Sequence, residues 1–215
     1  MALLMWSLLI APPADYPAER VKAWEPEIAL IEAKLKTTPP KPGAVFFAGS
    51  SSFRLWDTAK AFPDHDTVNV AFGGSELRDT VHFYDRILKP HAPGRIVLYA
   101  GDNDIAAGRT PDQVTDDFRA FVKLVHASDA KTKIDYVAIK PSPSRDKQRP
   151  KQDEANAAVR KLTLADDRLT FHDIVPELLN ADGKPDPKFF KLDRLHLNDA
   201  GYAAWKTTLL KAWAK

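Results

Sequence analysis

The sequence predicts an α/β fold in which a parallel sheet is covered by helices on both faces. Short apolar runs that suit buried strands alternate about five times with longer segments that carry a helical apolar stripe. Such alternation is typical of strand–helix–strand units joined by right-handed crossovers. In sheets of this kind, ligands bind at the carboxyl ends of the strands. We therefore expect the functional residues to directly follow the strands.

In the first half of the chain, the pattern predicts three helices and two strands, with a serine-rich turn before the second helix. Apolar residues from Val21 onward recur at intervals of three and four, and Pro26 is expected to kink this helix or to mark its start. A proline-rich segment after residue 36 ends it. A third apolar stripe predicts a helix between Ser75 and Pro90. The strands are expected at 45–48 and 67–72.

The second half of the chain repeats the alternation with clearer helix ends. Thr110, followed by Pro111 and by Gln113, has the composition of a helix N-terminus with a reciprocal cap. Asn198 is expected to cap the last helix. A further helix is expected over 155–164, and the remaining strands are expected at 95–100, 134–139 and 169–174.

Composition and charge fit one domain and exclude several classes of site. The chain has 215 residues, of which 44% are hydrophobic, so we expect a single domain over 16–215. The formal net charge of +2 and the lack of a basic run give no reason to expect nucleic acid as a partner. The sequence has no cysteine, which excludes disulfides and thiolate chemistry.

Residues 1–15 form a segment with a character of its own. About ten mostly apolar residues open it, too few to span a bilayer, so no integral membrane segment is predicted. The stretch resembles the apolar part of a secretory signal with cleavage near Ala14, although no Lys or Arg precedes it. We favour an exported, periplasmic or secreted protein over a cytoplasmic one, and a buried N-terminal arm is the structural alternative.

The turn after the first strand is the first candidate for chemistry. Three serines, Ser50 to Ser52, follow Gly49 and precede an apolar pattern that opens a helix. A hydroxyl placed there lies beside backbone N–H groups that have no partner in the helix and can stabilise negative charge. Helix capping is the more frequent role of such serines, so other segments must support a nucleophile.

Other strand ends supply what an acyl-transfer site needs. His196 could act as a base, and Asp193, three residues earlier, could fix its tautomer. Gly74 of a glycine pair and the amide of Asn103 could stabilise an oxyanion. Taken singly, the Asp193–His196 spacing could arise by chance, and the glycine pair and Asn103 also suit ordinary turns.

Together, these blocks resemble a known family. The order GSSS, NVAFGGS, GDND and DRLH followed by LNDAGY is similar to that of the SGNH hydrolases, also called the GDSL esterases and lipases, from about Ala44 onward. The resemblance implies a flavodoxin-like three-layer α/β/α sandwich with a five-stranded parallel sheet. It also assigns the site. The nucleophile would be Ser51, the base His196 and its partner Asp193, and the N–H groups of Ser51 and Gly74 with the amide of Asn103 would form the oxyanion hole.

One position departs from the family pattern. Ser50 stands where the family usually has Asp, so the hydrogen bonds that support the turn must differ. Because that Asp is not a triad member, we expect activity to survive.

The resulting hypothesis is two-step hydrolysis of carboxylic esters through an acyl-enzyme, with no metal or organic cofactor. The substrate class that the family suggests is a small acyl ester, such as an acetyl group on carbohydrate. Arg54, Lys140 and Arg145 could bind a polar or anionic part of it, or they could be solvated and packing residues. The sequence does not predict an oligomeric state.

Two other classes remain open from the residues alone. A serine-rich turn at a helix N-terminus could hold phosphate or flavin. A metal-dependent phosphoesterase could use Asp102, Asp104, Asp193 and His196, although these include only one histidine.

Overall fold

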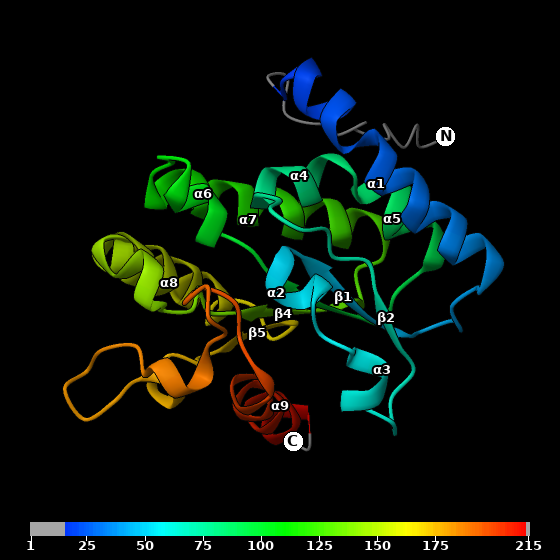
Figure 1. Ribbon diagram of the computed structural model, residues 1–215. Coiled ribbons are helices and arrows are strands. Elements are labelled where there is room, and N and C mark those ends of the chain that lie inside the picture. The colour runs from blue at the N-terminus through cyan, green and yellow to red at the C-terminus, as the bar shows by residue number, and fades with distance from the viewer. Residues whose placement is uncertain (1–15, 214–215) are drawn as a thin grey trace, which may run out of the picture.

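The computed structural model describes residues 16–213 as a five-stranded sheet between two layers of helices (Figure 1). The predicted signal or arm at 1–15 therefore lies outside the described residues. All four strand pairings are parallel, in the order β2-β1-β3-β4-β5. This order is that of a flavodoxin-like sheet and confirms the predicted fold class. The strands are β1 (Val45–Gly49), β2 (Thr67–Asn69), β3 (Arg95–Tyr99), β4 (Lys133–Val137) and β5 (Leu169–His172).

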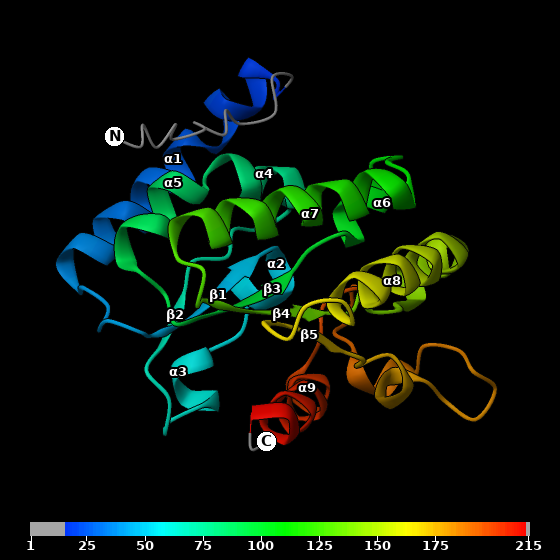
Figure 2. The same ribbon diagram turned by 180° about the vertical axis from the view of Figure 1, so that it is seen from behind.

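The helices cover both faces of the sheet, as Figures 1 and 2 show. In chain order they are α1 (Ala18–Thr37), α2 (Ser51–Arg54), α3 (Thr58–Ala61), α4 (Leu77–His82), α5 (Tyr84–Ile87), α6 (Asp102–Ala106), α7 (Pro111–Ser128), α8 (Arg149–Thr163) and α9 (Asp199–Trp213). Side chains from α1, α4, α5, α7 and α8 pack on one face, and those from α2 and α9 pack on the other.

The alternation of side chains along β1 explains these two layers. Phe46 points into the core beneath α4 and α7, whereas its neighbour Phe47 points to the opposite side, where aromatic residues of α2 and α9 gather. Both rings are fully buried. The aromatic side includes Phe53 and Trp205, whose ring centroids lie 5.8 Å apart edge to face. This packing fixes α2, and with it the serine turn, against the C-terminal helix.

Several element ends differ from the sequence prediction. The second strand ends at Asn69 instead of residue 72, and the helix predicted between Ser75 and Pro90 is divided into α4 and α5 at Phe83. The first helix starts at Ala18, so Pro26 lies inside it and does not mark its start. The Thr110–Gln113 cap is confirmed in both directions: the Gln113 N–H donates to the Thr110 hydroxyl over 3.2 Å, and the Thr110 N–H donates to the Gln113 side chain over 2.9 Å.

Candidate active site

The serine turn is built by a close approach of β1 to β3. Gly49 has φ +115°, and a Cβ added there would lie 2.0 Å from the carbonyl oxygen of Tyr99. Only glycine fits this position without moving a strand. The N–H of the next residue, Ser50, then donates to the same Tyr99 oxygen over 2.9 Å. The chain thereby turns into α2 with Ser51 at its first position.

His196 lies over this turn and selects one of the three serines. Its Nε2 is 3.0 Å from Oγ of Ser51, although 145 residues separate the two in the sequence. Ser50 and Ser52 are buried instead, with 2% and 1% of their surface exposed. The hydroxyl that can give its proton to an imidazole is therefore that of Ser51.

Asp193 completes a hydrogen-bonded chain. Its Oδ2 lies 2.7 Å from Nδ1 of His196, and its Oδ1 accepts the backbone N–H groups of Leu195 and His196, each over 2.9 Å. Partial desolvation opposes ionisation, but the hydrogen bonds from His196 and from these N–H groups lower the pKa of Asp193 to about 2. The carboxylate is ionised at neutral pH, so it can hold a proton on Nδ1 and leave Nε2 free to face Ser51.

The segment that carries this pair is held at both ends. The N–H of Lys191 donates to the carbonyl of His196 over 2.8 Å, and Phe190 pairs with Leu197 in an isolated bridge. Asn198 caps α9 as predicted, because its Oδ1 accepts the N–H of Gly201 over 3.1 Å. The imidazole is thus presented from a fixed turn.

Donors for an oxyanion are present at the neighbouring strand ends. Gly74 has φ +87°, a conformation that favours glycine. In the described part of the chain, neither its N–H nor that of Ser51 donates to a backbone oxygen. The Nδ2 group of Asn103 donates to the carbonyl of Ser75 over 3.0 Å, which occupies one of its two hydrogens. Asn103 is thereby tied to the glycine turn.

Asp104 is a supporting residue whose role the sequence analysis missed. Its carboxylate accepts the N–H of Leu77, at the start of α4, over 3.0 Å, and the N–H of Gly101, before α6, over 3.0 Å. It therefore joins the turn that carries Asn103 to the turn that carries Gly74. Burial raises the pKa of Asp104 to about 7. The only sequence signal is an acidic residue directly after Asn103, which the phosphoesterase alternative assigns as a metal ligand.

The three basic residues expected to bind substrate have different surroundings. Lys140 is 1% exposed, and its ammonium group lies 2.9 Å from Asp102 and 3.2 Å from the Tyr99 hydroxyl. This burial corrects the expectation that Lys140 contacts a substrate, because its charge is already bound inside the protein. Arg145 also turns inward, toward Asp102 and Asn103. Arg54 remains half exposed and pairs with Glu27 of α1 over 3.2 Å.

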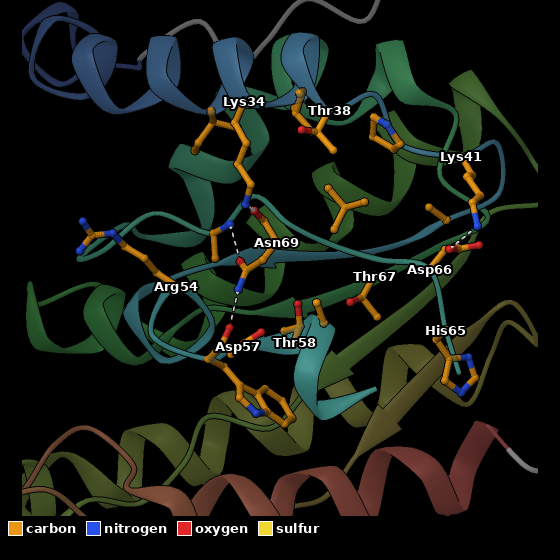
Figure 3. Close-up of a pocket in the computed structure, with 18 of the residues that line it drawn as sticks. Lys34, Thr38, Lys41, Arg54, Asp57, Thr58, His65, Asp66, Thr67 and Asn69 are labelled. Atoms are coloured by element: carbon orange, nitrogen blue, oxygen red, sulfur yellow. Dashed lines mark hydrogen bonds and ion pairs between the residues drawn. The ribbon is translucent and has the colours of Figure 1, made fainter. Parts of the chain in front are cut away.

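A separate groove of about 780 Å³ runs along the outer edge of the sheet, beside β2 (Figure 3). Lys34 of α1 extends across it toward the carbonyl of Asn69, and Asp57 lies on the opposite wall. Arg54 lines one part of the groove, but neither Ser51 nor any other member of the hydrogen-bonded chain is among its described lining residues. The hydroxyl–imidazole pair is therefore not located in this groove.

The structure gives no support to a metal site or a membrane span within the described residues. Across 16–213, no three His, Cys, Asp or Glu side chains are grouped so that they could hold a metal ion. In the same range, no helix combines the length and the apolar character that crossing a bilayer requires.

Fold and site together define a class of protein: an α/β ester hydrolase of the SGNH type, with its polar groups at the carboxyl ends of a parallel sheet. The model of the GDSL-like Lipase/Acylhydrolase family matches residues 45–204. The chain belongs to this family, which confirms the resemblance seen in the sequence. The match begins at β1, so α1 lies outside it.

Solved structures with this fold come from several bacteria. A Streptococcus pneumonia protein, described provisionally as a platelet activating factor, has a TM-score of 0.77 and 22% identity over 92% of this chain and 99% of that one. A GDSL-like lipase from Bacteroides thetaiotaomicron has a TM-score of 0.72 and 19% identity, over 89% of this chain and 95% of that one. A mutant acetyl-xylooligosaccharide esterase from Geobacillus stearmophilus has a TM-score of 0.63 and 13% identity, over 79% of this chain and 94% of that one. At these identities the similarity shows the fold. No curated protein matches the chain.

Proposed function

We propose that the chain is a serine esterase that hydrolyses small acyl esters through an acyl-enzyme on Ser51. The observation that carries the proposal is the continuous hydrogen-bonded chain from Ser51 through His196 to Asp193. A serine hydroxyl is a weak nucleophile until a base removes its proton, and this arrangement supplies the base and fixes its tautomer.

The reaction proceeds in two steps of the same kind. Oγ of Ser51 attacks the ester carbonyl while Nε2 of His196 takes the hydroxyl proton, and the imidazolium is stabilised by ionised Asp193. The proton then passes to the departing alkoxide, which leaves as an alcohol. Water, deprotonated by His196, attacks the acyl-enzyme and releases the carboxylic acid together with the free serine.

The N–H groups of Ser51 and Gly74 and the remaining amide hydrogen of Asn103 are the donors for the tetrahedral oxyanion in this proposal. Removing one such donor costs on the order of a hundredfold or more in kcat. Asn103→Ala should show a loss of this size.

The preference for a small acyl group rests on two considerations. One structural relative is described as an acetyl-xylooligosaccharide esterase. In this chain, the indole of Trp24 stands beside the glycine turn, 3.8 Å from where a Cβ on Gly74 would lie, and it packs edge to face on Phe72. The ring occupies space next to Gly74, which favours compact acyl groups in this proposal. Acetyl esters on carbohydrate are the natural substrates we propose.

Fluorophosphonate labelling followed by peptide mapping tests the reaction class and the register together. We expect one phosphonylated residue, Ser51. Ser51→Ala should abolish both labelling and hydrolysis of 4-nitrophenyl acetate, whereas Ser50→Ala and Ser52→Ala are matched controls that should retain labelling at Ser51. An active, labelled Ser51→Ala protein would refute the assignment. Nitrophenyl esters from acetate to octanoate test the acyl preference, and faster turnover of octanoate would contradict it.

A further inference from the structure

Arg145 lies behind the amide of Asn103, on the side away from its donor group. It belongs to the 3₁₀ helix Pro143–Gln148 that follows β4. One terminal nitrogen donates to Oδ1 of Asn103 over 3.0 Å, and the other forms an ion pair with Asp102 over 2.7 Å. Its side chain is 18% exposed. The guanidinium group therefore faces protein partners, which favours the packing role over the substrate-binding role that the sequence left open.

These contacts fix which way the amide of Asn103 points. The two ends of an asparagine amide have almost the same shape, so only their partners decide the orientation. A guanidinium group can only donate, so it must face Oδ1, and the carbonyl of Ser75 can only accept, so it must face Nδ2. Both partners impose the same orientation, with the N–H groups directed to the glycine turn.

The charges around Arg145 leave a net positive charge at this position. Asp102 is buried, and its carboxylate contacts both Lys140, over 2.9 Å, and Arg145. Burial alone would raise the pKa of Asp102, but the charges of Lys140 and Arg145 outweigh it and lower that pKa. One carboxylate thus faces two cations, so the cluster carries a formal charge of +1 against the oxygen of Asn103. A cation bonded to an amide oxygen strengthens its N–H groups as donors.

Further hydrogen bonds hold this cluster in place. Gln152 of α8 donates to Asp102 over 3.2 Å, and the N–H of Arg145 itself donates to the carbonyl of Ser142 over 3.0 Å. The next link reaches the base, because the N–H of Ser144 donates to the carbonyl of Arg194 over 3.1 Å, inside the turn between Asp193 and His196. The loop that carries Arg145 thus contacts both halves of the site.

We propose that Arg145 is a positioning residue that orients and polarises the Asn103 amide for the oxyanion, supported by the buried Asp102–Lys140 pair. This inference rests on the proposed esterase function. Arg145 acts through Asn103 and does not touch the ester. Its loss should therefore lower kcat and leave KM for a small ester within about twofold of the wild-type value, because the amide is needed most when the oxyanion forms.

The test compares Arg145→Met with Arg149→Met in the hydrolysis of 4-nitrophenyl acetate. Arg149 is a matched control on α8, where it pairs with Asp153 on the surface. We expect Arg145→Met to lower kcat about tenfold to a hundredfold and to slow fluorophosphonate labelling of Ser51 by a similar factor. The control should remain at the wild-type rate. A rise in KM with unchanged kcat would overturn the inference in favour of substrate binding.

A double-mutant cycle separates positioning from a general structural effect. In an Asn103→Ala background, Arg145→Met should cost less than twofold further, because the group through which it acts is already gone. Full additivity of the two losses would overturn the inference. If Arg145→Met does not fold, Arg145→Lys replaces it in the same cycle, since lysine keeps the charge but cannot bridge Asp102 and Asn103. If the wild-type protein neither labels nor hydrolyses, the esterase proposal fails; if it does both and the variants do not differ from it, only the role of Arg145 fails.

Discussion

Asparagine in place of Asp193 should be more harmful than a residue that cannot contact His196 at all. The N–H groups of Leu195 and His196 both point at Oδ1 of Asp193. In Asp193→Asn they hold the amide oxygen at that place, and the NH₂ group then faces Nδ1 of His196. Nδ1 must then accept a hydrogen bond, so the imidazole proton moves to Nε2, the nitrogen that faces Ser51. The base is lost although the geometry is kept.

The magnitude follows from two contributions. The carboxylate is 47% exposed and 2.7 Å from Nδ1, so with the screening of water its attraction for an imidazolium is about 332/(80 × 2.7), or about 1.5 kcal/mol. Losing the charge alone costs about tenfold in rate. The wrong tautomer adds to this, and the same change in the serine-protease triad lowers kcat about 10⁴-fold. We expect a loss of about 10³ or more for Asp193→Asn.

Asp193→Ser provides the comparison. A serine hydroxyl can still accept the backbone N–H groups of the turn, but it does not reach the imidazole. We expect the order wild type, then Asp193→Ser, then Asp193→Asn in kcat/KM for 4-nitrophenyl acetate, with urea unfolding showing that both variants are folded. If Asp193→Asn equals or exceeds Asp193→Ser, the tautomer argument is refuted.

Three further outcomes are expected. Gly49→Ala should lower the free energy of unfolding by about 3 kcal/mol or more, because the new carbon would lie 2.0 Å from the carbonyl oxygen of Tyr99. Gly108→Ala, whose new carbon meets nothing within 4 Å, should cost only about 1 kcal/mol of backbone strain. Equal losses in urea unfolding would contradict this expectation. The pKa of Asp104, raised from 3.8 to about 7, means that the folded chain binds its proton more tightly than the unfolded chain. The free energy of unfolding should therefore fall between about pH 4 and 7, by up to about 4 kcal/mol for about 3 pKa units. Asp104→Asn should remove this pH dependence. If the free energy of unfolding of the wild type minus that of Asp104→Asn rises with pH, the assignment is wrong. Treatment with a chelator should leave hydrolysis unchanged, and a loss restored by added metal would favour the phosphoesterase alternative.

The parts of the fold that depend on local pattern were predictable. Alternating apolar runs located all five strands, and the Thr110 cap located the start of α7. The five-residue helix α6 was not predicted, because one turn is too short to show an apolar stripe. It is stabilised by a side chain, since Asp104 accepts the N–H of Gly101. The break at Phe83 likewise has no signal in the apolar stripe.

The site residues also differ in how far the sequence could predict them. The order of the sequence blocks predicted Ser51, Asn103 and His196 as site residues, and the structure brings Ser51 and His196 into contact. The surroundings of Lys140 could not be predicted. Its partner Asp102 is 38 residues away in the sequence, and a proline-rich loop gave no reason to expect burial. Pairings of this kind are set by tertiary structure, which a reading of neighbouring residues does not detect.

The long separation between Ser51 and His196 has a consequence for biosynthesis. A ribosome that has released the serine turn must add 145 further residues before the histidine emerges. Throughout that interval the nascent polypeptide holds a hydroxyl that no base can activate. In the proposed mechanism, hydrolytic competence is therefore acquired late, when the C-terminal part of the domain docks, and a chain abandoned during translation should be inert toward esters.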